Sequence, residues 1–368
     1  MKYNITKLTK QSNSNINNIF ENYPQFMNYT IKNTYFIKLL YTLLDKSSDL
    51  ELDHTIDKTR EHIHVNSSYV SPEITQFIRD NEFYTYKTIL QIKNITFNIS
   101  FHSIDEINIE RYLYFVKIAL NMCSQSHNNK EFNFKIILTD FKKTYPCIPI
   151  EPAHINSGLT YPAKNEVILF RKEEWLKVFI HECFHLFCLD FCDVDLDFKR
   201  LFKPLYNIES DFLFFETLTE FWARTINIAI ISYSTKKYIM YDEFASLMQI
   251  NIQVERIYCI CQMNNLLSKM GFTYESLMDK ERSLLFKENT NFFCYYVLTS
   301  VLFFHYEQTM AWFIEHNETL LQFSKNKQNV YLFFQYIKQI YRNPAFLKMI
   351  KNLNLNINNC NMTAFEMI

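Results

Sequence analysis

The sequence predicts an α+β fold with a small mixed sheet, a backing helix and a mainly helical C-terminal part. Period-two alternation of apolar and polar residues, typical of strands, occurs only before residue 171, and helical spacing dominates the rest of the chain. The predicted order is a hairpin, a helix, two strands, a helix and then only helices. Such segregation favours α+β over repeated βαβ units.

The first 80 residues form a predicted N-terminal extension that is partly helical. It passes from a polar arm, through an apolar helix-like run at 35–44, into a charged stretch. Residues 84–92 and 95–101 then alternate with period two on either side of Lys93-Asn94. This pattern predicts a β-hairpin.

Residues 105–123 place apolar side chains at helical spacing, with Asp105 in position to cap the helix. A strand is predicted at 132–138, followed by a proline-containing loop and a second strand at 166–170. The next helix is expected over about 173–189.

Another helix is predicted from Ser210 to about residue 232, and further helices follow to the end of the chain. We divide the chain into the extension, a core at 81–235 and a helical C-terminal subdomain at 236–368. The most apolar run, 292–306, is shorter than the roughly 18 to 20 residues of a membrane-spanning helix and predicts a buried core helix.

Composition excludes several classes of function. With 38 basic and 39 acidic residues and no basic block, the chain shows no electrostatic signal for nucleic acid or anionic membrane. It has two glycines where average usage would give roughly 26, which excludes glycine-rich phosphate-binding motifs. The oligomeric state is not predicted by any feature of the sequence.

The cysteines and the N-terminus favour the cytoplasm. The nine cysteines are scattered and form no C-x-x-C pair, which predicts free thiols in a reducing compartment. The N-terminus lacks an apolar signal region, so we expect the protein not to be secreted.

The strongest motif is His181-Glu182-x-x-His185 within the helix predicted over 173–189. Residues four apart lie on one helix face, so both imidazoles can bind one Zn²⁺ at roughly 2.0 to 2.1 Å. Glu182 would lie beside the metal, where a carboxylate can take a proton from activated water. The competing interpretation is a chance motif in a buried helix, but burying three unpaired polar groups costs a few kcal/mol.

Two histidines leave the third zinc ligand open. The metzincin extension requires Gly and a ligand where the chain has Cys188 and Phe191, so that family is excluded. Asp190 is a lesser candidate. The better candidates are Glu216 and Glu220, two carboxylates four apart in an almost wholly apolar helix, which suggests that one binds metal and the other holds a ligand histidine.

With these residues the chain resembles the gluzincin metallopeptidases over about residues 84–229. In their thermolysin-like pattern Glu216 would be the ligand and Glu220 would orient a histidine. In their aminopeptidase-like pattern the string at residues 219–223 makes Glu220 the ligand, and we prefer Glu220 slightly. The loop between His185 and either glutamate is longer than is usual for the family. The composition also resembles that of zincin-like proteins of large DNA viruses, which implies the host cytoplasm or the virion.

The resemblance implies further features of the site. Zincins place an edge strand beside the cleft, and we assign this role to residues 166–170. Metallopeptidases also use a Tyr or His donor for the oxyanion, for which Tyr295, Tyr296, His305 and Tyr306 are candidates. Gly158, just before the expected edge strand, predicts a loop turn or, less commonly, a close approach of the backbone.

These observations together predict a zinc-dependent metallopeptidase that hydrolyses peptide or protein substrates. The alternative is a catalytically inactive zincin-fold protein with a structural or protein-interaction role, including one from a large DNA virus.

Overall fold

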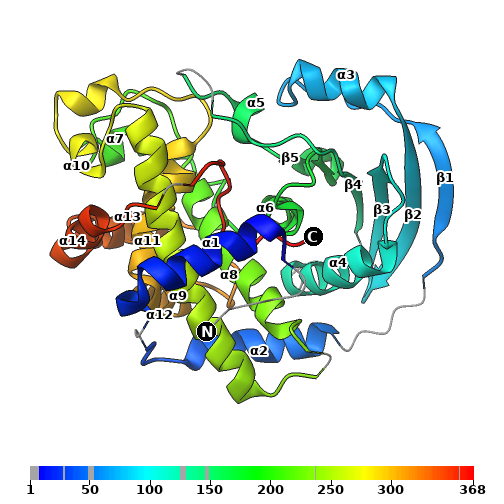
Figure 1. Ribbon diagram of the computed structural model, residues 1–368, viewed down its shortest axis with the longest axis horizontal. Coiled ribbons are helices and arrows are strands. Elements are labelled where there is room, and N and C mark those ends of the chain that lie inside the picture. Colours follow the sequence, from blue (N-terminus) through cyan, green and yellow to red (C-terminus); the bar gives the residue numbers. More distant parts are fainter. Residues whose placement is uncertain are drawn as a thin grey trace.

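A mixed sheet forms one side of the molecule and a body of helices forms the other (Figure 1). The computed structural model describes residues 8–27, 30–48, 54–124, 130–145, 149–236, 238–355 and 357–368. Within these ranges the protein has the predicted α+β architecture, with a six-stranded open sheet and a largely helical C-terminal part.

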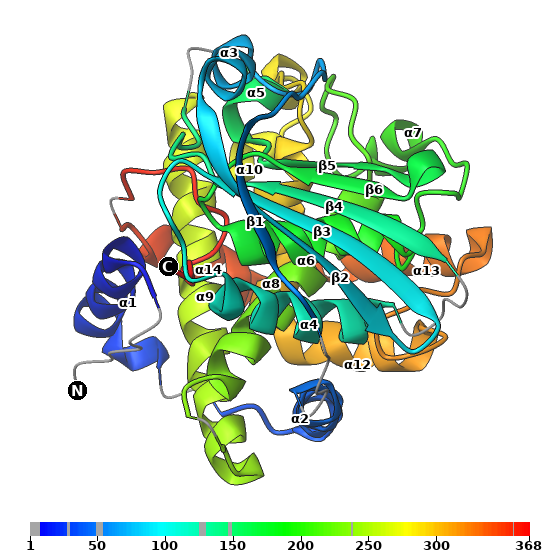
Figure 2. The same cartoon turned by 90° about the vertical axis from the view of Figure 1, so that its right-hand side faces the viewer.

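The six strands lie in the order β1-β2-β3-β4-β6-β5 (Figure 2). Their bounds are β1 (Asp57–His62), β2 (Glu82–Ile92), β3 (Ile95–Ser103), β4 (Glu131–Ile137), β5 (Gly158–Tyr161) and β6 (Glu166–Leu169). Pairing is antiparallel for β1 with β2, β2 with β3, and β5 with β6. Pairing is parallel for β3 with β4 and for β4 with β6. β5 is the last strand in the order, so it is an edge strand, and it contacts α6 of the helical body.

The helices are of very different lengths. Their bounds are α1 (Lys10–Asn22), α2 (Tyr35–Ser48), α3 (Pro72–Asp80), α4 (Ile109–Cys123), α5 (Pro152–Ile155), α6 (Trp175–Leu186), α7 (Phe198–Phe202), α8 (Phe215–Tyr233), α9 (Tyr241–Lys269), α10 (Tyr274–Leu277), α11 (Thr299–Phe304), α12 (Tyr306–His316), α13 (Lys327–Ile340) and α14 (Pro344–Asn352). None of the described helices has both the length and the apolar character needed to cross a membrane.

The two faces of the sheet are covered differently. Phe97, Ile99 and Phe101 of β3 belong to the main core, which α4 and α6 complete, and the alternating residues Asn98 and Ser100 point to the opposite face. On that opposite face a smaller cluster gathers beneath α3 around Ile78, Phe83 and Ile137. The sheet therefore supports α6 from one side, with α3 over one end of the other (Figure 2).

Helix α8 is the central helix of the body. Every residue from Glu216 to Tyr233 is buried, in keeping with a sequence that is apolar nearly all round. It packs against α6 on one side and α9 on the other. The main core extends from Leu8 to Met367, so all three predicted parts of the chain share it.

Most predicted elements in the first half are confirmed, with changes at their ends. The hairpin is β2 and β3, in register at Ile92 and Ile95. The helix predicted from Asp105 begins at Ile109 after Asn108, so the capping role of Asp105 was wrong.

Two helix predictions in the second half need larger corrections. The helix predicted from Ser210 is α8, and it starts only at Phe215. The Ser210 hydroxyl donates to the Phe286 carbonyl and does not cap a helix. The run 292–306 is buried as predicted except for the half-buried Phe304, but it forms a π-helical turn (Phe293–Leu298), α11 and the start of α12 instead of one helix.

The described cysteines are free, as predicted. Cys147 and Pro146 of the predicted proline-containing loop lie outside the described residues.

Candidate metal centre

Helix α6 carries the His-Glu-x-x-His motif in the middle of the molecule. Trp175, Phe179 and Cys183 bury its apolar faces, and His181 and His185 lie one turn apart. Their ring centroids are 4.9 Å apart. The helix thus offers both imidazoles to one point, as the spacing predicts.

The C-terminal end of α6 turns back sharply. Cys188 adopts a left-handed conformation with φ 49°, and the Leu189 amide donates to the Phe184 carbonyl at 2.9 Å. The Cys188 amide donates to the His185 carbonyl at 3.1 Å, which completes a Schellman motif with a non-glycine residue. This turn returns Asp190 to the helix, where its Oδ2 lies 2.6 Å from His185 Nδ1.

Helix α8 supplies a carboxylate to the two imidazoles. Glu216 Oε2 lies 3.1 Å from His181 Nε2 and 3.4 Å from His185 Nε2, and the two Nε2 atoms are 3.1 Å apart. In a tetrahedron with zinc-to-ligand distances of roughly 2.0 to 2.1 Å, neighbouring ligand atoms are about 3.3 Å apart. The three atoms therefore lie close enough together to bind one metal ion.

The hydrogen bonds behind the imidazoles fix which nitrogens face the centre. His181 Nδ1 lies 3.0 Å from Glu220 Oε2, and His185 Nδ1 faces Asp190. Ionised carboxylates only accept hydrogen bonds, so both Nδ1 atoms donate and a neutral imidazole presents the lone pair of Nε2. Two lone pairs and a carboxylate oxygen then converge on one point, an arrangement that can bind a metal cation.

Charge around the centre decides how strongly protons compete with a metal for the imidazole nitrogens. Glu216 Oε2 is buried and accepts no hydrogen bond from any described residue. Burial raises the pKa of Glu216, but His185 and His181 outweigh burial and lower it to about 2. Burial lowers the pKa of both histidines, but Glu216, with Glu220 at His181 and Asp190 at His185, raises each above its ordinary value. The residues present fit a divalent metal. Protons compete with such a metal for the imidazole nitrogens.

Of the two candidate ligands on α8, the geometry favours Glu216 over Glu220. Glu220 lies on the Nδ1 side of His181, while Glu216 lies with the two Nε2 atoms and completes the described metal-capable group. Asp190, the lesser candidate, likewise lies behind a histidine. The helix α8 thus follows the pattern in which the first carboxylate faces the centre and the second holds a histidine.

A buried network holds Glu220 in place. Lys177 Nζ lies 3.1 Å from Glu220 Oε2, and Arg224 Nε lies 2.8 Å from Glu220 Oε1. Burial raises the pKa of Glu220, but Lys177 and Arg224 outweigh burial and hold it well below its ordinary value. Glu220 therefore stays ionised and can accept from His181.

Glu182 points to the edge strand β5. Thr160 Oγ1 donates to Glu182 Oε2 at 2.6 Å. Gly158 lies so close that a Cβ there would be 2.9 Å from Glu182 Cγ and from Val178 Cγ1. Gly158 therefore permits close packing of strand on helix, and the loop turn favoured for it was wrong.

The edge strand itself was also misassigned. Residues 166–169 form β6, which lies inside the sheet between β4 and β5, so β5 is the strand beside the site. β5 is only four residues long and begins with Gly158, so its sequence shows no recognisable alternation of apolar and polar residues.

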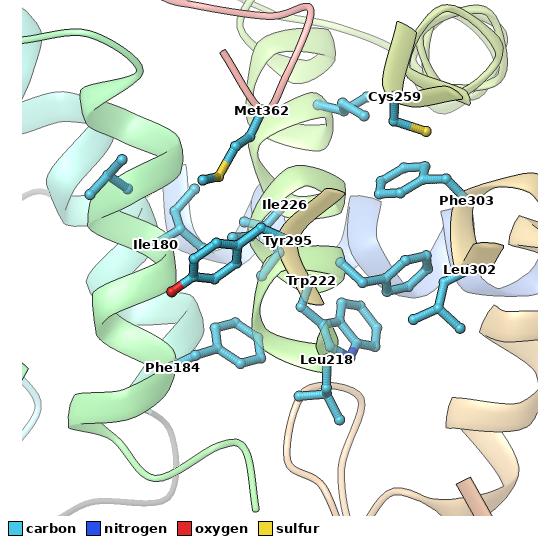
Figure 3. Close-up of a cluster of buried hydrophobic side chains, with 14 of the residues drawn as sticks. Ile180, Phe184, Leu218, Trp222, Ile226, Cys259, Tyr295, Leu302, Phe303 and Met362 are labelled. Atoms are coloured by element: carbon cyan, nitrogen blue, oxygen red, sulfur yellow. The ribbon is translucent and has the colours of Figure 1, made fainter. Parts of the chain in front are cut away.

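A cavity of about 480 Å³ opens over the centre. It is bordered by β5, the motif helix and the first turn of α8, and Tyr295 contributes to its lining. Figure 3 shows the Tyr295 hydroxyl directed towards α6, between Ile180 and Phe184. Its ring centroid lies 5.8 Å from that of His181.

The other oxyanion candidates lie away from the cavity. Tyr296 donates to the Cys360 carbonyl at 2.6 Å. His305 Nδ1 pairs with Gln308, and the Tyr306 hydroxyl donates to Thr225. None of the three lines the cavity, so Tyr295 is the one candidate that the structure brings to the centre.

Sequence reasoning missed Lys177 and Thr160 as parts of the site. Lys177 is four residues before His181, so its place on the same helix face was available from the spacing. Thr160 carried no such signal, because its role depends on β5 lying beside α6.

No protein-family model, curated protein or solved structure matches the chain.

Proposed function

We propose that the protein is a zinc-dependent peptidase. The observation that carries this proposal is the convergence of His181 Nε2, His185 Nε2 and Glu216 Oε2, with each imidazole held from behind by a carboxylate. Glu182 and the edge of β5 that has no partner among the described strands border the same cavity, an arrangement that suits the hydrolysis of an extended peptide.

His181, His185 and Glu216 would hold the ion. Zinc bound there supplies a Lewis acid that polarises a carbonyl and lowers the pKa of water. Glu220 and Asp190 keep the two imidazoles oriented, because each accepts from an Nδ1 atom.

The chain's own residues carry the proton transfers. Glu182 takes a proton from the attacking water and passes it to the departing amine, the usual work of a general acid and base. Thr160 donates to Glu182 Oε2 and so fixes the orientation of that carboxylate. Tyr295 lines the same cavity and would donate a hydrogen bond to the carbonyl oxygen as it gains charge.

The edge of β5 gives the substrate a place to bind. It pairs with β6 on one side, and its other edge has no partner among the described strands. An extended peptide can add to such an edge through main-chain hydrogen bonds. Gly158 and Thr160 then face α6 while the peptide backbone lies along the strand.

The test is hydrolysis by a Glu182→Gln variant. General acid and base catalysis contributes about 100- to 10,000-fold, so we expect a loss of that order in kcat with one zinc per chain retained. A quenched fluorescent pool of random peptides provides the assay, and metal content is measured on the same samples. Equal hydrolysis by the variant and the wild type would exclude the proposed role of Glu182.

A catalytically inactive zincin-fold protein is the second candidate. The observation in its favour is that carboxylate oxygens of Glu216, Glu220 and Asp190 lie 2.6 to 3.4 Å from the imidazole nitrogens, so protonated imidazoles can pair with these carboxylates without metal. A folded wild-type protein that binds no zinc and cleaves no peptide of the pool supports this alternative.

A further inference from the structure

The cavity over the metal centre also borders residues whose side chains belong to the other face of the sheet. We call these residues the outer rim and define it by Tyr69, Leu159 and Tyr161, all of which line the cavity. None of the three carries a charge. Among the described residues, the charged ones that line the cavity come from α6, from α8 and from Lys143. The outer rim therefore differs in chemistry from the metal centre.

Alternation along β5 places Leu159 and Tyr161 in the outer rim. Gly158 and Thr160 face α6, where both lie against the side chain of Glu182. Successive side chains of a strand point to opposite faces. Leu159 and Tyr161 therefore point away from α6, and both pack in the smaller cluster beneath α3.

Tyr69 extends this surface with an exposed ring. It lies between β1 and α3 and is 55% exposed. The next residue, Val70, packs in the same smaller cluster as Leu159, so this part of the chain lies on the outer side of β5. A side chain that covers the ring of Tyr69 removes apolar surface from water, which is favourable.

Charges of opposite sign flank Tyr161. Lys164 Nζ lies 5.2 Å from the centroid of the Tyr161 ring. Glu166 is directly opposite Tyr161 in the β5–β6 pair, so its side chain lies on the same face. This pair of charges therefore favours neither a basic nor an acidic side chain of a ligand.

The free edge of β5 presents main-chain groups to an added strand. The Phe170 amide donates to the Ser157 carbonyl at 3.0 Å, so these opposite residues form a hydrogen-bonded pair. Such pairs alternate with non-bonded pairs in antiparallel strands. The main-chain groups of Leu159 therefore also face β6, and those of Gly158 and Thr160 point to the free edge.

A peptide bound along this edge alternates as β5 does. Side chains directly opposite one another on neighbouring strands lie on the same face. The peptide residues opposite Gly158 and Thr160 thus point towards α6 and the metal centre. The peptide residues opposite Leu159 and Tyr161 point to the outer rim, at two positions roughly 7 Å apart.

We propose that the outer rim is a specificity subsite for an aromatic or large aliphatic side chain of a peptide substrate. This inference rests on the proposed peptidase function. Such a side chain covers the rings of Tyr69 and Tyr161, and burial of apolar surface is favourable on both partners. A small polar or charged side chain at the same position gains little from this burial.

The experiment measures selection by the zinc-loaded full chain from a random octapeptide library with blocked ends. The cleaved products are sequenced by mass spectrometry on both sides of the cut. We expect wild type to favour Phe, Tyr and Leu over Ser and Asn by about tenfold at one position, or at two positions separated by one residue. Equal use of these residues at every position would overturn the subsite.

Two variants test the outer rim, and a third is the matched control. Tyr69 is largely exposed, so Tyr69→Lys should fold, lower the apolar preference about threefold or more and increase the use of Asp and Glu at that position. Tyr161→Ser should also lower the preference, and it keeps the test valid if Tyr69→Lys does not fold. Tyr35→Lys changes another tyrosine that is 55% exposed, on α2 and outside the cavity, and should leave the selection unchanged.

Binding separates this proposal from the peptidase proposal. The same library is bound to the Glu182→Gln chain, and the retained peptides are sequenced. Apolar selection that falls in Tyr69→Lys, without any hydrolysis by wild type, keeps the subsite and overturns the peptidase. Hydrolysis with no apolar preference, or with one that is the same in Tyr69→Lys and Tyr161→Ser, overturns the subsite and keeps the peptidase. Neither hydrolysis nor retention of any peptide would overturn both.

Discussion

Glu216 and Glu220 are identical side chains one helical turn apart, but their surroundings give them different roles. Glu216 has a buried oxygen that accepts no hydrogen bond from the described residues and has two imidazole nitrogens beside it. Glu220 has Lys177, Arg224 and the Nδ1 of His181 as partners. The first carboxylate can bind a cation, and the second is already occupied.

Substituting each glutamate by glutamine tests this division. Glu216→Gln removes a charged ligand, so we expect zinc affinity to fall more than about 100-fold. Glu220→Gln keeps the three ligands and loses only support for His181, for which a loss of about 10- to 100-fold is typical. Competition with a chelator of known affinity measures both. A larger loss in Glu220→Gln than in Glu216→Gln would reverse the assignment.

Adding one methyl group should lower activity at Gly158 but only stability at Gly271. In Gly158→Ala the new Cβ lies 2.9 Å from Glu182 and Val178, so Glu182 must move and kcat/KM should fall about tenfold or more. Gly271 has open space around it but φ +78°, so Gly271→Ala should cost about 1 kcal/mol of stability and leave activity unchanged. Peptide hydrolysis and urea unfolding of both variants check this, and full activity of Gly158→Ala would contradict it.

The sequence predicts those site residues whose relative positions are set by a single helix. His181, Glu182 and His185 follow from spacing on α6 alone. The choice between Glu216 and Glu220 depends on which turn of α8 lies beside the two histidines of α6. A shift of α8 by one turn would exchange the two glutamates. Asp190 required the left-handed turn at Cys188, which a non-glycine residue does not signal.

The hairpin of β2 and β3 contains a histidine that titrates far from its ordinary range. His102 lies opposite Thr85 in the hairpin. Its Nδ1 is hydrogen-bonded to Thr85 Oγ1 at 2.9 Å and its Nε2 to Ser100 Oγ at 3.0 Å. Burial, helped by Lys135 and Lys87, lowers the pKa of His102 from 6.5 to about 3. The folded sheet therefore keeps this imidazole neutral.

The sign of the resulting pH dependence follows from the two states. Below pH 6.5 the unfolded chain binds a proton at His102 and the folded chain does not, so stability falls as pH drops towards 3. The shift corresponds to about 4 kcal/mol lost across this window. His102→Gln should remove this part of the acid sensitivity, measured as the free energy of unfolding against pH. His62→Gln on exposed β1 is the control, and parallel curves for wild type and His102→Gln would contradict the account.

The sequence predicts elements with a regular apolar pattern and misses those without one. β2, β3, α4 and α6 each bury one face or all faces, so their periodicity is visible. β1 has the sequence DKTREH and is almost wholly exposed, as suits a charged edge strand. Its pairing with β2 could not be read from alternation.

At the scale of the whole molecule, the segment Asn361–Met367 joins the parts of the chain. It is buried throughout, and the amides of Met362 and Thr363 donate to Glu174, just before the motif helix. The Phe365 carbonyl accepts from Asn227 of α8, and Met367 forms a bridge with Leu8. The segment thus supports the motif helix from behind the cavity.

Truncating one side chain of this segment should weaken the whole fold. Phe365 is 1% exposed in the main core, so Phe365→Ala should cost about 3 to 5 kcal/mol. Leu285 is 69% exposed, and Leu285→Ala should change stability by less than about 0.5 kcal/mol. Urea unfolding followed by tryptophan fluorescence and by far-UV circular dichroism measures both. A loss below 1 kcal/mol for Phe365→Ala would show that the segment is not part of the core.

The zinc centre is the claim on which the rest depends, and anomalous diffraction at the zinc absorption edge tests it most directly. Crystals of the wild-type chain grown with zinc should show one strong peak within roughly 2.0 to 2.2 Å of His181 Nε2, His185 Nε2 and a Glu216 oxygen. A peak bound by Glu220 in place of Glu216, or no peak at the two histidines, would contradict the account.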